Sequence, residues 1–252
     1  MPDSTIFALG GAGGDAQPDS YVENSATTFS PSNSWAGLVA DSTGNNHNST
    51  ATTFDEGVHN AKFFGRGTSN TWECNRSFFA FDLSGESSTV ASADLKIKTD
   101  NLGDTDTNSS TVYVVAATDL SSNTGDYGNV FSSGTTLGTL YGSTTISTTE
   151  QYHTWTLNSD AISRINTLIG SGGIFTIGLM GYYDYNNSAP GSNELKIQVL
   201  YANQIATSSD PKLELTFAAA GYTHKVVSVA AGSIGKVNGV ATANIGKINS
   251  VD

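Results

Sequence analysis

The sequence predicts an all-β protein: a jelly-roll-like antiparallel β-sandwich with one short helix, followed by a repeated β/turn tail at the C-terminus. The composition includes 27 glycines and only 13% charged residues, which is typical of short strands joined by many turns. Several segments alternate apolar and polar residues, as strands with one solvated face do. A third observation is an apolar repeat with a period of eleven residues, confined to 225–252.

The predicted strands begin near residue 35. The clearest is 90–99, where Ala93, Leu95 and Ile97 alternate with Asp94 and Lys96. The other segments show the same alternation or a short apolar run, and they lie at 35–40, 60–65, 79–83, 111–117, 152–157, 174–180, 195–201 and 212–217. Stretches rich in Gly, Asn and Asp, such as 41–50 and 121–129, supply the turns between them.

One segment, 157–173, has helical periodicity instead. Ser159 or Asp160 is the predicted N-cap and Gly170 the predicted stop. Two antiparallel sheets packed face to face with one helical crossover form a jelly-roll-like sandwich. This predicts three parts of the chain: a flexible or partner-ordered Gly-rich arm at 1–14, the sandwich at 15–219 and the tail at 220–252.

Four stretches resemble, in order, the DNRLRE-type domain. They are RSFFAFDLS (76–84), VASADLKIK (90–98), HTWTLNSDAISRIN (153–166) and SSDPKLELTF (208–217). The resemblance covers roughly 15–217 and implies a jelly-roll sandwich similar to carbohydrate-binding modules, of the kind found in secreted surface proteins and phage structural proteins. Because the matching motifs are mostly core-strand patterns, the resemblance indicates a fold more than a ligand.

In the tail, Lys225, Lys236 and Lys247 open three copies of the unit KVxxVAxxxIG, the third limited to residues 247–252, and β-branched residues follow each lysine at fixed offsets. These repeated residues are Lys225, Val226, Val229 and Ile234, then Lys236, Val237, Val240 and Ile245, then Lys247, Ile248 and Val251. A unit this short has too little surface to offset the entropy of ordering it alone. The tail is therefore predicted to be an assembly device, and it resembles the terminal repeats of phage tail and head appendage proteins.

The conformation of the tail has three alternatives. An eleven-residue period also suits a right-handed helical supercoil, but each of Gly232, Gly235, Gly239 and Gly246 costs a helix about 1 kcal/mol relative to Ala. Strands and turns are favoured, which would add to a partner's open sheet edge or wind with neighbouring subunits. A disordered C-terminus is the third alternative, and the regular apolar content speaks against it.

The formal net charge is -12, which repels phosphate backbones and anionic headgroups, so neither nucleic acid nor membrane is an expected partner. With Cys74 as the only cysteine, no intrachain disulfide is possible, as is usual for proteins made in a reducing compartment. The N-terminus lacks the pattern of a secretory signal, and no segment approaches the roughly 18 apolar residues of a membrane span. Synthesis in a host cytoplasm and a final place in a virion are expected.

No catalytic motif such as HExxH or GxSxG surrounds any histidine, so no enzyme is predicted. His153, beside Trp155, is read as a structural strand residue. Asp55, Glu56 and His59 share a loop that a metal would fit, although a solvated loop is favoured. No cofactor is expected apart from structural calcium, for which the candidates are Asp15, Asp19, Asp82 and Asp184.

The candidate binding surface is the segment 180–193, MGYYDYNNSAPGSN. Aromatic rings stack on sugar faces while Asp and Asn bond hydroxyl groups, so a glycan site is predicted there. Its residues are Tyr182, Tyr183, Asp184, Tyr185 and Asn186. The alternative is a strand end with its tyrosines packed against the sandwich.

Three functions compete on these grounds. The first is a non-enzymatic virion structural protein: a phage-like capsid decoration protein or a tail or head appendage (tail fiber) subunit, displayed on the particle surface and anchored through its termini. Its partners would be copies of itself, other virion structural proteins and host surface glycans. The second is a carbohydrate-binding module that recognises cell-surface glycans. The third is a filament-forming surface adhesin.

Overall fold

The computed structural model describes residues 2–9, 20–27, 34–48, 58–64, 70–99, 110–118, 120, 123–146, 151–190, 195–198, 200–201, 210–219, 236–237 and 240–241. The chain divides into two compact units, Met1–Thr216 and Phe217–Asp252. Every strand pair in the described residues has an antiparallel register. The predicted fold class, an all-β sandwich with a short helix, is confirmed.

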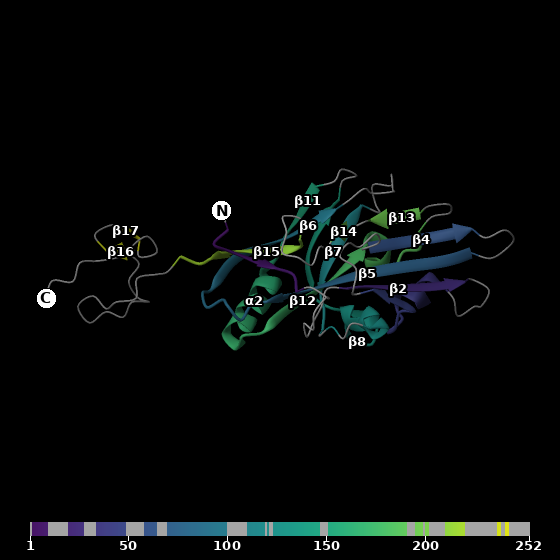
Figure 1. Ribbon diagram of the computed structural model, residues 1–252, viewed down its shortest axis with the longest axis horizontal. Helices are drawn as coiled ribbons and strands as arrows, with labels where there is room; N and C mark the ends of the chain where they lie inside the picture. The colour runs from purple at the N-terminus through teal and green to yellow at the C-terminus, as the bar shows by residue number, and fades with distance from the viewer. Residues whose placement is uncertain are drawn as a thin grey trace. The chain divides into compact units, whose positions relative to one another are not determined.

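The larger unit contains two main sheets (Figure 1). The smaller sheet has the order β1 (Ser4–Phe7), β15 (Lys212–Phe217), β6 (Val90–Thr99) and β11 (Gln151–Thr156), and β14 (Leu200–Tyr201) also pairs with β6. The larger sheet has the order β10 (Leu140–Thr145), β7 (Thr111–Ala116), β12 (Ile174–Gly181), β5 (Asn70–Asp82), β2 (Ser20–Thr27) and β3 (Asn46–Asn48). In addition, β4 (Val58–Phe64) pairs with β5 and with β13 (Leu195–Gln198), and β8 (Phe131–Ser133) forms a separate hairpin with β9 (Thr136–Leu137).

The two main sheets share an apolar core. On β6, Leu95 and Ile97 are fully buried while Lys96 between them is half-buried, as the alternation predicts. Trp155 of β11 is fully buried, and its Nε1 donates a hydrogen bond of 2.9 Å to the carbonyl of Val112 in β7 of the other sheet. His153, on the same strand, is also buried, and burial lowers its pKa. A buried position on a strand is consistent with the prediction that His153 is a structural residue.

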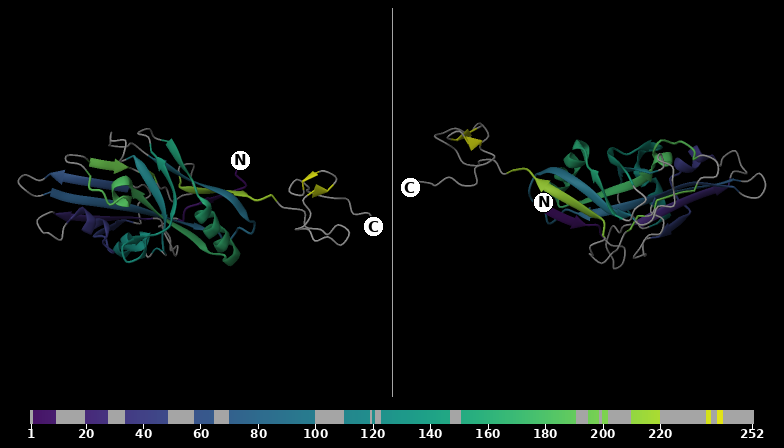
Figure 2. Two further views of the ribbon diagram at one scale, coloured as in Figure 1. Left: turned by 180° about the vertical axis from the view of Figure 1, so that it is seen from behind. Right: turned by 90° about the horizontal axis from the view of Figure 1, so that it is seen from above.

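Helix α2 (Ser159–Ser171) is the helix that the periodicity predicts. Its N-cap is Asn158, whose side chain accepts hydrogen bonds from the backbone amides of Asp160 and Ala161. Its C-cap is Gly172, whose φ of 66° is a conformation that favours glycine. The predicted caps were thus off by one or two residues. Figure 2 shows α2 at one end of the sandwich, while β2, β4 and β5 extend toward the opposite end.

The larger sheet is covered on its outer face as well. Residues 74–81 of β5 are all buried, although successive side chains of a strand point to opposite faces. Three short helical segments form this cover: α1 (Trp35–Val39), the 3₁₀ helix η1 (Thr124–Val130) and α3 (Tyr182–Tyr185). The sandwich therefore has a third layer that the sequence did not predict.

Two predictions from the sequence are wrong here. The strand expected at 35–40 is helix α1: the Ser34 side chain caps it by accepting from the Gly37 amide, and Trp35, Leu38 and Val39 are buried on one helical face. The Gly-rich arm at 1–14, expected to be flexible or ordered by a partner, contains β1, which pairs with β15 of the same chain from Ser4 to Phe7. The arm is held because Leu9 packs on the outer core and its amide donates to the carbonyl of Ala80 at 2.8 Å. Residues 10–14 lie outside the described residues.

The tail unit contains one described hairpin. Strand β16 (Lys236–Val237) pairs with β17 (Val240–Ala241) in a register that places Val237 opposite Val240. The two residues between them are Asn238 and Gly239, the dipeptide that most favours a two-residue hairpin turn. The other repeated residues, Lys225, Val226, Val229, Ile234, Ile245, Lys247, Ile248 and Val251, lie outside the described residues. In the part of the chain that the structure describes, no helix has the length and apolar character needed to cross a membrane.

Candidate functional site

The predicted glycan segment forms the end of β12 and the single helical turn α3. Tyr182, Tyr185 and Asn186 are three and four residues apart, so they share one face of this turn, and they are half-buried or exposed. The Tyr185 ring stacks on Tyr113 of β7, with ring centroids 4.0 Å apart and an interplanar angle of 8°. The Asn186 side-chain amide donates to the Tyr182 carbonyl at 2.9 Å and lies 3.4 Å from the Tyr113 hydroxyl. We call Tyr113, Tyr182, Tyr185 and Asn186 the tyrosine surface.

The other two predicted glycan residues lie beneath this surface. Tyr183 is 8% exposed and Asp184 is 1% exposed. The Tyr183 ring packs edge-on against the Tyr182 ring, with ring centroids 5.3 Å apart. The helical turn directs Tyr183 and Asp184 to its inner face, so a direct contact of either residue with a sugar does not fit this structure.

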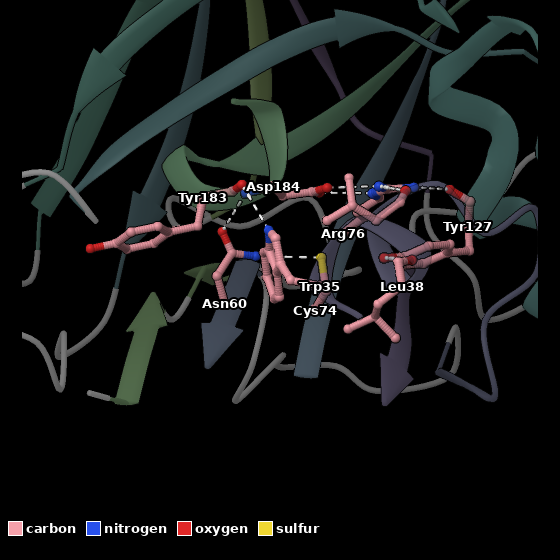
Figure 3. A network of polar contacts seen from close by, with 9 residues as sticks. Trp35, Leu38, Asn60, Cys74, Arg76, Tyr127, Tyr183 and Asp184 are labelled. Carbon is pink, nitrogen blue, oxygen red and sulfur yellow. Dashed lines mark hydrogen bonds and ion pairs between the residues drawn. The ribbon is translucent and has the colours of Figure 1, made fainter. Parts of the chain in front are cut away.

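Asp184 instead forms a buried ion pair with Arg76 of β5 (Figure 3). The pair is bidentate: Nε of Arg76 donates to Oδ2 at 2.8 Å and Nη2 donates to Oδ1 at 2.7 Å. Burial by itself would lower the pKa of Arg76, but the Asp184 carboxylate outweighs it and raises that pKa above its ordinary value. The guanidinium therefore stays charged at neutral pH, and its Nε and Nη2 bind both oxygens of the Asp184 carboxylate.

The same guanidinium holds two further segments of the outer layer. Its Nη1 donates to the Tyr127 carbonyl in η1 and its Nη2 to the Val39 carbonyl in α1, both at 2.7 Å. Its central carbon also lies 3.9 Å from the centre of the Tyr127 ring, a cation–π contact. Arg76 thus joins β5, α1, η1 and α3 through one side chain.

Neighbouring polar groups complete the network in Figure 3. The Asn60 side chain accepts from the Asp184 amide at 3.2 Å and donates to Cys74 Sγ at 3.4 Å. Trp35 Nε1 donates to the Tyr183 carbonyl at 3.3 Å, and the Tyr127 hydroxyl donates to the Leu38 carbonyl at 3.1 Å. Burial raises the pKa of the Cys74 thiol well above its ordinary value, so this thiol stays protonated and packs rather than reacts.

This network fixes the position of the tyrosine surface. Because α3 is a single turn, too short to be stable by itself, its orientation depends on Asp184 and on the bonds to Asn60 and Trp35. A β-carbon on Gly181, just before α3, would clash with the Asn60 side chain, so glycine at this position lets the backbone lie close to Asn60. The network thus holds the tyrosine surface in a pre-organised arrangement.

The predicted metal ligands are not brought together in the described residues. Asp184 is occupied by Arg76, and the Asp82 carboxylate accepts from the Ser84 amide in an exposed turn. Asp15, Asp19, Asp55 and Glu56 lie outside the described residues, as does the side chain of His59. Within the described ranges, no three His, Cys, Asp or Glu side chains gather in a way that would hold a metal ion.

Sequence reasoning missed Arg76 and Tyr113. Arg76 stands two residues before the apolar run FFAF (78–81) of the same strand, and a charged residue so close to that run was the available signal. Tyr113 gave no local signal, because its stacking partner is 72 residues away in sequence. Comparison of the chain with models of known protein families gives no match, and neither does comparison with curated proteins.

Proposed function

We propose that this protein is a non-enzymatic structural subunit of a phage-like virion. In this proposal a DNRLRE-type sandwich is displayed on the particle surface, as a capsid decoration or a tail or head appendage. The repeated tail binds copies of the chain or other virion structural proteins. The observation that carries the proposal is the tail: a compact unit separate from the sandwich, built from a repeat whose described part is a hairpin of two-residue strands.

The size of the hairpin supports an assembly role. Two strands of two residues each are far below what an isolated hairpin needs to be stable in water. The sandwich, in contrast, has its own core on both sides of the larger sheet. The apolar repeats therefore gain most by packing against another polypeptide chain.

Charge is consistent with this role. The tail from 225 onward carries three lysines and one acidic residue, so the acidic excess of the chain lies upstream. An acidic sandwich facing solvent limits non-specific association between particles. A mildly basic tail is attracted to acidic protein surfaces, including the sandwich of a neighbouring copy.

The mass of the purified chain in solution tests the proposal. We expect the full chain to sediment as a multimer and a chain truncated after Phe217, which keeps all of β15, to sediment as a folded monomer. Electron microscopy of the full chain separates a closed oligomer from the fibres of a filament-forming adhesin. A full chain that sediments as a monomer at all concentrations would contradict the proposal.

The tyrosine surface favours a second function, recognition of cell-surface glycans. The stacked pair Tyr113–Tyr185 and the exposed Asn186 amide combine a flat aromatic platform with a hydrogen-bonding group, as sugar-binding sites do. The two functions are compatible, because a surface-displayed virion subunit is well placed to contact host glycans.

We expect Tyr185→Ala to weaken binding of any glycan identified on an array by about tenfold, the effect of losing one stacking contact. Tyr152→Ala is the matched control, because Tyr152 is a half-buried tyrosine on β11 of the other sheet. Replacing Tyr183 would not be informative, because its burial means that the substitution would disturb folding. Equal glycan binding by the wild type and Tyr185→Ala would exclude the tyrosine surface as the binding site.

A further inference from the structure

A pocket of about 330 Å³ lies beside helix α2 and shares no residue with the tyrosine surface. Its volume is at the lower end of the range for small-molecule sites. It is lined by Ala116, Ala117, Thr118, Tyr141, Arg164, Ile174 and Thr176, from the end of β7, from β10, from α2 and from the start of β12. The pocket belongs to the sandwich and is independent of the tail.

Among the described residues that line the pocket, Arg164 is the only basic one. It is exposed on α2, and among the described residues no carboxylate lies within 4.0 Å of its guanidinium. Most of the acidic excess of the chain is in the same unit. An arginine that remains without an ion pair in so acidic a domain is available to an anionic ligand.

Tyr141 supplies a second polar group. Its side chain is 5% exposed and its ring stacks on Phe175 at 5.5 Å, yet its hydroxyl makes no hydrogen bond to any described residue. The hydroxyl oxygen itself is accessible, so a ligand in the pocket can reach it. Burial raises the pKa of Tyr141, so the hydroxyl is protonated at neutral pH and can donate.

We propose that this pocket binds a small ligand that carries a carboxylate, of the size of an acidic monosaccharide. The Arg164 guanidinium pairs with the carboxylate and the Tyr141 hydroxyl donates a hydrogen bond to the ligand. Ala116, Ala117 and Ile174 supply the apolar contacts on which a sugar ring or a similar carbon skeleton packs. This site goes beyond the proposed function, since neither particle assembly nor the tyrosine surface requires it.

Asp160 lies one helical turn before Arg164, and its charge acts on Tyr141 in the direction opposite to that of Arg164. A carboxylate ligand would be repelled by Asp160. Asp160→Asn is therefore expected to strengthen binding, whereas a site that recognises a neutral sugar would not respond in this way.

The test is calorimetric titration of the full chain with sodium glucuronate, with glucose as the neutral analogue and sulfate as an anion without a carbon skeleton. We expect glucuronate to bind, and Arg164→Gln and Tyr141→Phe each to weaken it by about tenfold, the effect of removing one charge-assisted hydrogen bond. Lys212→Gln, which removes a positive charge from the smaller sheet, is the matched control and should leave binding unchanged.

Three results would overturn the inference. They are no glucuronate binding, equal binding of glucose or sulfate, and unchanged glucuronate binding in Arg164→Gln. Far-ultraviolet circular dichroism of each variant verifies that it is folded. Since Arg164 is exposed, its replacement is not expected to affect folding.

Discussion

Replacing Asp184 by Asn is expected to lower the free energy of unfolding of the sandwich by about 3–5 kcal/mol, the usual cost of removing one partner from a buried ion pair. Asparagine has almost the same shape but no charge, so the Arg76 guanidinium would remain buried without a counter-charge. All four segments that Arg76 joins would be affected, because the guanidinium also binds the carbonyls of Val39 and Tyr127.

Urea denaturation followed by tryptophan fluorescence measures this effect, since Trp35 and Trp72 lie in the same outer core with ring centroids 5.7 Å apart. Asp82→Asn is the control: Asp82 is exposed, and the amide oxygen of asparagine can still accept from the Ser84 backbone. We expect this control to change stability by less than about 0.5 kcal/mol. A loss below about 1 kcal/mol in Asp184→Asn would mean that the ion pair does not hold the outer layer.

Replacing Val237 and Val240 by Asp is expected to convert the multimer to a monomer while the sandwich remains folded. The two positions face each other in the register of β16 and β17. Two like charges directly opposite destabilise a hairpin, and neither can enter an apolar interface without a large desolvation cost. The expected effect is therefore a loss of assembly rather than a small decrease in affinity.

Sedimentation velocity measures this change in mass. Thr242→Asp with Asn244→Asp is the matched control, because it adds the same two charges to the same repeat copy at positions that are polar in the sequence. We expect the control to remain a multimer. If both double variants dissociate, the added net charge causes the dissociation and the loss of the repeated valines does not. If neither dissociates, assembly does not depend on this hairpin.

Much of the fold could be predicted from local patterns. The alternation in 90–99 matches β6 to the residue, and the helical spacing in 157–173 gives α2. These patterns succeed because one face of each element is buried and the other is solvated. The strand β2, with sequence SYVENSAT, has no such alternation, so no local pattern indicated it.

The outer layer could not be predicted because its elements show no clear periodicity. Residues 74–81 of β5 are buried on both faces, so burial shows no period of two there, and the short helix α1 has too few residues to reveal a helical period. The glycan site stays a prediction: Tyr182, Tyr185 and Asn186 are half-buried or exposed, whereas Asp184 is buried and paired with Arg76. That pairing joins residues 108 positions apart, and only the folded chain brings them together.

Our central claim is that the sandwich folds independently and that the repeated tail becomes ordered against another polypeptide chain. Hydrogen exchange of the full chain, measured by mass spectrometry at a concentration where it is multimeric and after dilution to monomer, tests this claim most directly. We predict that peptides covering Lys236–Ala241 are protected only at the higher concentration, while peptides covering β5 and β6 are protected equally at both. Equal protection of the tail in the dilute monomer would show that its own subunit orders it, and would contradict the claim.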